Sequence, residues 1–138
     1  MVKISFSKLL KQRRAWYKTI KKIYCPLLKN WVVFNSKGFY HLRYTTGGKM
    51  RKIKEQHYKL GLLPLVIPTI RNAKRIYKYQ KLYSKTLGKD VEFWALREWI
   101  GRQKTTVKVI LRKIGSGNIT FFSVMKKNDR NKKTTRKK

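Results

Sequence analysis

Two histidines are the side chains of this sequence best suited to acid–base chemistry, because an unperturbed imidazole titrates near neutral pH. His41 lies between Tyr40 and Arg43, and His57 lies in a lysine-containing segment next to Tyr58. The surrounding positive charge favours the neutral imidazole, which is the form that a general base requires. Each histidine taken alone also fits a structural or merely exposed role.

Carboxylates are scarce in this chain, and this restricts the chemistry that it can support. The five acidic residues are scattered as Glu55, Asp90, Glu92, Glu98 and Asp129. Nucleases that use metals hold the ions with clustered carboxylates, so a metal-dependent nuclease is disfavoured. The single cysteine, Cys25, has no Cys or His neighbour at zinc-ligand spacing and excludes an internal disulfide. We therefore expect chemistry without a metal or cofactor.

The charge of the chain calls for a polyanionic partner. Lys and Arg number 37 against 5 Asp and Glu in 138 residues, which gives a net charge of +32. Such a charge opposes compaction through self-repulsion, and nucleic acid is the first candidate to neutralise it. Aromatic side chains among the cations favour base stacking beside phosphate contacts. The residues that we expect to bind nucleic acid are Lys49, Arg51, Lys59, Arg75, Tyr77 and Lys108.

Cleavage of RNA without a metal needs a base for the 2′-hydroxyl, an acid for the leaving 5′-oxygen, and cations around the phosphate. A chain that is poor in carboxylates and rich in Arg, Lys, His, Tyr and Thr contains these groups. It also lacks an apolar run long enough to cross a membrane and a secretory signal. We expect a cytoplasmic protein that has no contact with a membrane.

The elements that must position these residues follow from the hydrophobic periodicity. We expect an amphipathic helix over residues 5–28, a hairpin of strands 31–34 and 39–44, a helix over 49–60, and a short helix or two turns over 62–70. Strands are expected over 73–79, 91–100, 105–114 and 119–125. The fold class is α+β, with N-terminal helices packed on a twisted antiparallel sheet of about four to six strands.

The chain divides into three parts by composition. Residues 1–30 are expected to form a basic amphipathic helical extension, residues 31–126 the main domain, and residues 127–138 a disordered basic tail. On a strand over 39–44, alternation places His41 and Arg43 on one face and Tyr40 and Leu42 on the other. That arrangement sets an imidazole beside a guanidinium.

The order of segments resembles the phage and mobile-element branch of the Barnase-EndoU-colicin-RelE (BECR) superfamily of metal-independent ribonucleases and toxins. The likeness is carried by residues 39–43 on an early strand, by the proline-containing segment 62–73 with the strand after it, and by the closing pair of strands, 107–112 and 118–125. It covers residues 31–126 and implies a BECR-like nuclease domain there.

The resemblance also implies roles for particular residues. It makes His41 the leading catalytic residue and Arg43 a phosphate partner, and it places Thr120 and Ser123 at or beside the scissile phosphate. Alternation along the last strand separates Thr120 from Ser123, so at most one of them would line the site. An ordinary sheet surface explains both residues equally well. Arg112 shares a face with Lys108 and Ile110 and would complete a cationic cleft.

The leading hypothesis from the sequence is a metal-independent endoribonuclease, with a toxin as one form of it. His41 would deprotonate the 2′-hydroxyl, Arg43 and Arg112 would stabilise the phosphorane, and His57 or Tyr58 would protonate the leaving group. The product would be a 2′,3′-cyclic phosphate.

Two other hypotheses remain open. One is a non-enzymatic RNA- or ribosome-binding protein on the same fold, and the other is a DNA-binding accessory of a mobile element. The expected partner of the nuclease and of the binding protein is RNA, which is tRNA, mRNA or ribosome-associated RNA. The expected partner of the mobile-element accessory is DNA. A toxic nuclease would also need an acidic antitoxin or immunity protein.

Overall fold

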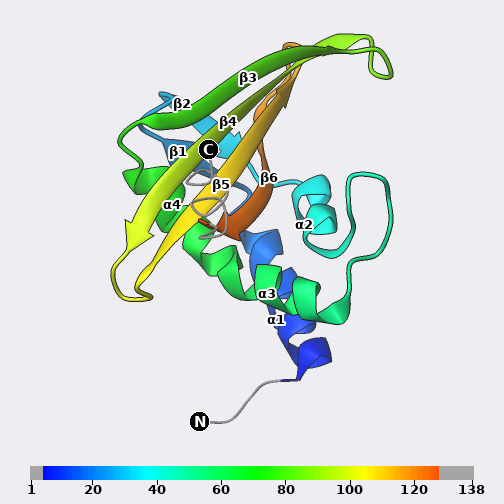
Figure 1. Ribbon diagram of the computed structural model, residues 1–138, viewed down its shortest axis with the longest axis vertical. Helices are drawn as coiled ribbons and strands as arrows, with labels where there is room; N and C mark the ends of the chain where they lie inside the picture. Colours follow the sequence, from blue (N-terminus) through cyan, green and yellow to red (C-terminus); the bar gives the residue numbers. More distant parts are fainter. Residues whose placement is uncertain (1–4, 128–138) are drawn as a thin grey trace, which may run out of the picture.

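The computed structural model describes residues 5–127, in which helices pack on a six-stranded sheet (Figure 1). The elements are α1 (Phe6–Ile20), β1 (Lys22–Cys25), β2 (Asn30–Val33), α2 (Ser36–Arg43), α3 (Ile53–Leu62), the 3-10 turn η1 (Leu63–Leu65), α4 (Val66–Asn72), β3 (Ile76–Ser84), β4 (Lys89–Ile100), β5 (Thr105–Ile114) and β6 (Ile119–Lys126). The α+β class expected from the sequence is confirmed.

The sheet has the strand order β1-β2-β6-β5-β4-β3. Neighbouring strands are antiparallel, except that β2 runs parallel to β6. The expectation of a wholly antiparallel sheet is therefore wrong at this one pairing. A long connection separates β2 from β6 in the chain, and a connection of that kind allows parallel pairing.

Helix α1 is capped by Ser5, whose side chain accepts a hydrogen bond from the backbone N–H of Lys8, and it buries Leu9 and Tyr17. It ends at Ile20, because Lys21 adopts a positive φ of 61° and the chain turns into β1. The predicted helix over 5–28 is thus too long. Residues 22–25 pair with 30–33 and alternate between exposed and buried, so strand pairing overrides the helical periodicity.

Helix α2 replaces the strand predicted over 39–44. Asn35 caps it by accepting hydrogen bonds from the backbone N–H groups of Lys37 and Gly38, and Phe39 and Leu42 are buried one turn apart. That spacing of three buries one face of a helix. The predicted hairpin of 31–34 with 39–44 is therefore wrong, although its first strand is present as β2.

The remaining elements lie close to their predicted places. Helix α3 overlaps the helix predicted over 49–60 but continues to Leu62, and η1 with α4 forms the short helical segment expected over 62–70. The four later strands are present as β3 to β6, of which β3 continues to Ser84, beyond the predicted end at residue 79. The predicted extension over residues 1–30 and the predicted main domain share one hydrophobic core. Leu9 and Tyr17 of α1 pack in the same cluster as Phe121 and Val124 of β6. Apart from Lys127, the predicted tail over 127–138 lies outside the described residues.

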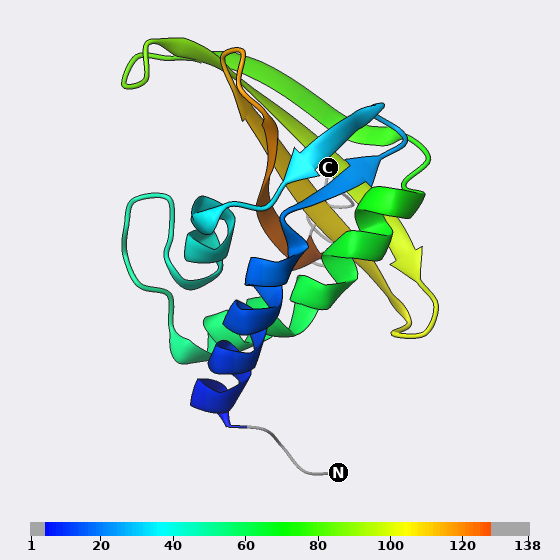
Figure 2. The ribbon, with the colours of Figure 1, turned by 180° about the vertical axis from the view of Figure 1, so that it is seen from behind.

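The sheet has two different faces. Figure 2 shows α1 and α4 in front of one face, where Val107, Val109 and Leu111 of β5 are buried. We call the opposite side the outer face. The strand registers place on it Lys78 and Gln80 of β3, Phe93, Ala95 and Arg97 of β4, Lys108, Ile110 and Arg112 of β5, and Thr120 and Ser123 of β6.

The edge of β6 beyond its short pairing with β2 is covered by α3. The Lys59 ammonium donates to the carbonyl oxygen of Val124 at 2.9 Å, and the backbone N–H of Lys126 donates to the Tyr58 hydroxyl at 2.7 Å. Backbone groups left unpaired at a sheet edge need such partners. In the described part of the chain, no helix is both long and apolar enough to span a membrane.

Candidate active site

A cavity of about 440 Å³ lies where α2 meets the outer face of the sheet, and we call it the His41 cavity. Helix α2 contributes a lysine one turn before the histidine, because Lys37 and His41 are four residues apart. β5 contributes Arg112. The cavity is lined by Ser36, Lys37, Tyr40, His41, Thr46 and Arg112.

The ring of Phe122 supports both the imidazole and the guanidinium of this cavity. Its centroid lies 4.5 Å from that of His41 and 4.6 Å from Cζ of Arg112, and the Phe93 ring contacts it at 5.6 Å. Phe122 thus lies on the outer face. Alternation from Thr120 on the same strand gives Phe122 this direction, and the irregularity opposite Ile110 and Leu111, which leaves one extra residue on the β6 side, brings Ser123 to the same face.

Helix α2 reaches this position through a close contact at Gly38. A Cβ atom at residue 38 would lie 2.5 Å from the Tyr17 hydroxyl and 2.8 Å from the carbonyl oxygen of Phe121. Any side chain would therefore push α2 away from β6. Glycine at this position sets the distance between His41 and Phe122.

The His41 side chain is half-buried among cations. Burial is the largest cause that lowers its pKa, and the positive charges of Arg112, Arg51 and Lys37 also lower it. Because an ordinary histidine titrates at about 6.5, a lowered pKa leaves the imidazole neutral at pH 7. His41 can then accept a proton.

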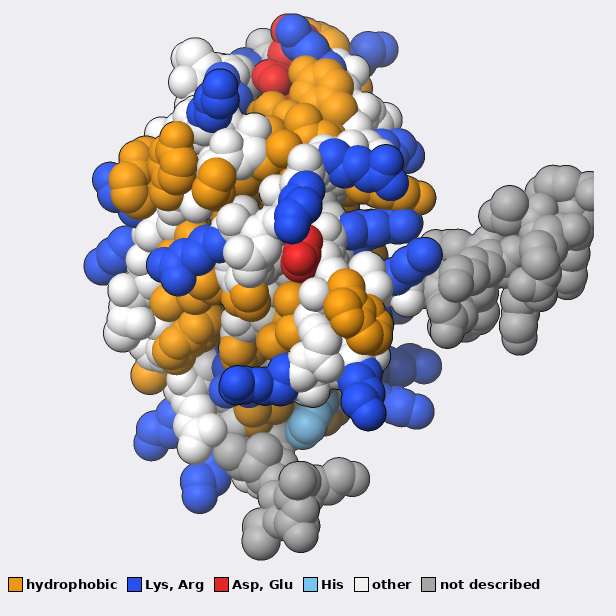
Figure 3. Space-filling view, turned by 90° about the vertical axis from the view of Figure 1, so that its left-hand side faces the viewer, with side chains coloured by type: hydrophobic (Ala, Val, Ile, Leu, Met, Phe, Trp, Pro, Cys, Tyr) orange, Lys and Arg blue, Asp and Glu red, His pale blue; other side chains and the backbone are white. Residues whose placement is uncertain are grey.

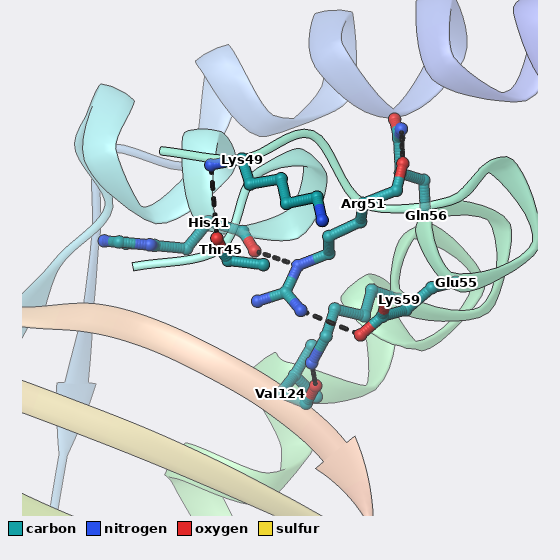
Figure 4. Close-up of polar contacts among 8 residues, drawn as sticks. All are labelled: His41, Thr45, Lys49, Arg51, Glu55, Gln56, Lys59 and Val124. Atoms are coloured by element: carbon teal, nitrogen blue, oxygen red, sulfur yellow. Dashed lines mark hydrogen bonds and ion pairs between the residues drawn. The ribbon is translucent and has the colours of Figure 1, made fainter. Parts of the chain in front are cut away.

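Arg51 holds the backbone of α2 from behind the imidazole (Figure 4). Its Nε donates to the carbonyl oxygen of His41 at 3.0 Å, and its Nη1 donates to Glu55 at 2.8 Å in an ion pair. The figure shows the His41 ring directed away from this guanidinium. The buried Gln56 links the same region, since it donates to the Arg51 carbonyl and accepts from Nε of Arg43.

Arg43 does not lie beside His41, contrary to the strand-based expectation. Residues two apart on a helix point in nearly opposite directions, and Arg43 contacts Gln56 and the ring of Tyr44 instead. The cations near His41 are Arg112, Lys37 and Arg51. Of these, Arg112 was expected in the site and Lys37 was not.

His57 and Tyr58 are separated from the His41 cavity. His57 lines a different cavity of about 430 Å³ with Arg13, and its ring lies 6.4 Å from that of Phe6. The Tyr58 hydroxyl is engaged by the backbone of Lys126. The structure does not bring either residue to His41, so neither is placed to protonate a leaving group there.

Thr120 and Ser123 both lie on the outer face. Thr120 is opposite Arg112 and Ser123 is opposite Ile110, because the extra residue at Phe122 interrupts the alternation between them. The expectation that alternation separates the two residues is therefore wrong. The Thr120 hydroxyl donates to the Arg112 carbonyl at 3.1 Å, and it stabilises the strand pair next to the cavity.

The residues expected to bind nucleic acid fall into two groups. Lys49, Arg75 and Tyr77 are exposed, and Lys108 lies on the outer face. Arg51 is held by His41 and Glu55, and Lys59 of α3 is only 6% exposed because it packs against β6. The assignment of Lys59 to nucleic-acid binding is wrong, because its ammonium is enclosed under β6.

Three of the four acidic side chains among residues 5–127 lie on the side of β4 that faces away from the His41 cavity. Asp90, Glu92 and Glu98 alternate with outer-face residues, and their cross-strand partners are Tyr83, Lys81 and Val107. With Glu55 on α3, these are all the carboxylates among residues 5–127, so the outer face has none. Figure 3 shows, on one side of the molecule, many Lys and Arg side chains with exposed hydrophobic ones between them.

Within residues 5–127 there is also no group of three or more His, Cys, Asp and Glu side chains that could hold a metal ion. Comparison with protein-family models, curated proteins and solved structures finds no match for this chain. The likeness to the BECR superfamily consequently rests on the sequence segments, of which residues 39–43 lie on a helix.

Sequence reasoning missed Lys37, Tyr40, Thr46 and Phe122 as site residues. The signal that could have found the first two is the cap at Asn35 followed by buried residues at Phe39 and Leu42. A helix starting there puts Lys37 beside His41.

Proposed function

We propose that this protein is a metal-independent endoribonuclease whose reaction takes place in the His41 cavity. The observation that carries the proposal is the half-buried imidazole of His41, with its pKa lowered by burial and by cations, beside Arg112 and above the Phe122 ring. When a 2′-hydroxyl attacks the adjacent phosphate, the reaction needs a base to take the hydroxyl proton and positive charge to stabilise the phosphate. A neutral imidazole next to a fixed guanidinium supplies both.

The reaction can be written with the groups of this cavity. His41 takes the proton of the 2′-hydroxyl while the 2′-oxygen bonds to phosphorus, and negative charge builds on the phosphate oxygens. The guanidinium of Arg112 and the ammonium of Lys37 offset that charge. The P–O5′ bond then breaks, and the leaving oxygen takes a proton from the Tyr40 hydroxyl or the Lys37 ammonium. The products are a 2′,3′-cyclic phosphate and a 5′-hydroxyl.

A second candidate function is RNA binding without cleavage. The observation that favours it is the outer face, which combines Arg97, Lys108 and Arg112 with the half-buried Phe93 and carries no carboxylate among the described residues. Such a surface binds phosphates in a salt-dependent way whether or not a bond is cut. An acidic protein partner would compete for the same surface.

The test is cleavage of total RNA by the purified protein in the presence of EDTA. We expect cleavage by the wild-type protein, with 2′,3′-cyclic phosphate ends, and a loss of at least ~100-fold in His41→Ala, the usual contribution of a general base. His57→Ala is the matched control, because His57 lines a separate cavity. Equal cleavage by the wild-type protein and His41→Ala would refute the proposal, and RNA binding without any cleavage would favour the second function.

A further inference from the structure

The outer face carries a second group of cations away from the His41 cavity. Arg97 of β4 and Lys108 of β5 stand directly opposite each other, and Lys78 of β3 is opposite the neighbouring Ala95. Like charges in direct cross-strand pairs destabilise a sheet. The ion pairs among the described residues are Arg51 with Glu55 and Lys81 with Asp90, so no described carboxylate offsets Arg97 or Lys108. A bound anion would.

An aromatic ring lies against this group. Cζ of Arg97 is 3.3 Å from the centroid of the Tyr77 ring, and Tyr77 is 48% exposed. Tyr77 falls at a register irregularity between Ile76 and Lys78, which turns it toward Arg97 on the outer face. Nε of Arg97 is enclosed and has no hydrogen-bond partner among the described residues. An exposed ring backed by a guanidinium is a stacking platform for a nucleic-acid base.

A hollow of about 250 Å³ lies on the outer face beside this group of cations. Apolar side chains of Phe93, Ala95 and Ile110 and polar ones of Lys78, Gln80 and Lys108 line it. Phe93 in turn contacts Phe122 beside His41. Lys108 and Arg112 are four residues apart on β5, which corresponds to about 13 Å. That distance is spanned by about four nucleotides at a stacked spacing of 3.4 Å.

We infer that Tyr77, Arg97 and Lys108 form a subsite for single-stranded RNA. This subsite binds a nucleotide that lies about four nucleotides along the strand from the scissile phosphate. Tyr77 stacks on the base, and Arg97 and Lys108 hold the adjoining phosphate. Duplex RNA keeps its bases stacked inside the helix, so it cannot offer one to the ring. The inference rests on the proposed function for the position of the scissile phosphate, but the subsite itself can be measured by binding alone.

The experiment uses the full chain and 2′-O-methyl oligouridines, which have no 2′-hydroxyl nucleophile and are bound without cleavage. Fluorescence anisotropy is measured for oligomers of about two to twelve nucleotides, a range that brackets common single-strand site sizes. We expect affinity to rise once the oligomer exceeds about four nucleotides. Tyr77→Ala should bind the longer oligomers about tenfold more weakly than the wild-type protein, because one base loses its stacking partner. Tyr77→Phe keeps the ring and should retain the wild-type affinity.

Tyr83→Ala is the matched control, since Tyr83 is an exposed tyrosine on the same strand but is opposite Asp90 on the other face. Lys108→Gln should lower the slope of log affinity against log salt by about 0.7, the value for one single-strand phosphate contact. Equal binding by Tyr77→Ala and Tyr83→Ala would overturn the subsite, as would an equal effect of Tyr77→Ala on a duplex. A length-dependent gain that needs Tyr77 in a protein that cleaves no RNA would support the subsite and refute the nuclease.

Discussion

Lys59 is the buried charge of this fold whose energetic consequence can be worked out in most detail. Its ammonium is enclosed between α3 and β6 and donates to the Val124 carbonyl. Its pKa is lowered from 10.5 to about 8, mainly by burial and in smaller part by the charge of Arg51, while the charge of Glu55 opposes the change. In the unfolded chain the amine keeps its ordinary pKa, so between pH 8 and 10.5 only the unfolded state holds the proton.

The sign of the effect follows from this proton difference. Stability rises with pH wherever the unfolded state binds more protons, by about 1.4 kcal/mol for each pH unit. Lys59 therefore adds about 2–3 kcal/mol to the free energy of unfolding between pH 8 and pH 10, and its contribution is constant below pH 8. Lys59→Met removes the titration and keeps most of the side-chain volume. It also leaves the Val124 carbonyl without its donor, at a cost of about 1–3 kcal/mol.

We therefore expect the free energy of unfolding of Lys59→Met to differ from that of the wild-type protein by no more than about 1–2 kcal/mol at pH 7. At that pH the loss of the hydrogen bond and the removal of a buried charge offset each other. At pH 10 the variant should be less stable by about 2 kcal/mol more than at pH 7. Urea unfolding followed by tryptophan fluorescence at several pH values measures both. Lys54→Met, on the exposed side of α3, should show no such change. A stability difference for Lys59→Met that stays constant from pH 7 to pH 10 would refute the reasoning.

Three further predictions concern the cavity. Gly38→Ala should destabilise the fold by about 1–3 kcal/mol through overpacking against Tyr17 and Phe121, measured by urea unfolding, and no loss would contradict the close contact. The NMR titration midpoint of His41 should lie below 6.5 and move upward in Arg112→Gln, because one of the lowering charges is removed, and a midpoint that stays fixed would exclude that coupling. Phe122→Ala should lower cleavage by at least ~10-fold with a smaller effect on the binding of 2′-O-methyl RNA, since it removes the ring that positions His41 and Arg112.

The strands of the last third could be predicted because one face of each is buried. Val107, Val109 and Leu111 alternate with outer-face residues, and glycine-containing turns separate the strands. Strand β1 could not be predicted in the same way, since its four residues continue the apolar spacing of α1. Its pairing with β2 and the turn at Lys21 depend on contacts outside the segment.

The candidate site was predicted in part, and for reasons that the structure separates. His41 was found from its residue type, and Arg112 from its strand face, and both line one cavity. Arg43 was placed by alternation on a strand that is in fact a helix. Ser123 faces outward only because of an irregularity in the pairing of β5 with β6, for which a single sequence gives no sign. Phe122 was missed because its contacts with His41 and Arg112 depend on how α2 packs over the sheet.

The order in which the site's parts occur along the chain affects when it can act. Helix α2 supplies His41 early, whereas Arg112 and Phe122 come from the last two strands described. During translation the imidazole would leave the ribosome long before the ring and the guanidinium that orient it. Activity in this cavity would begin only after β6 has emerged and paired with β5. A nascent chain would thus be harmless to the messenger RNA and ribosome that are producing it until β6 has been made and has folded.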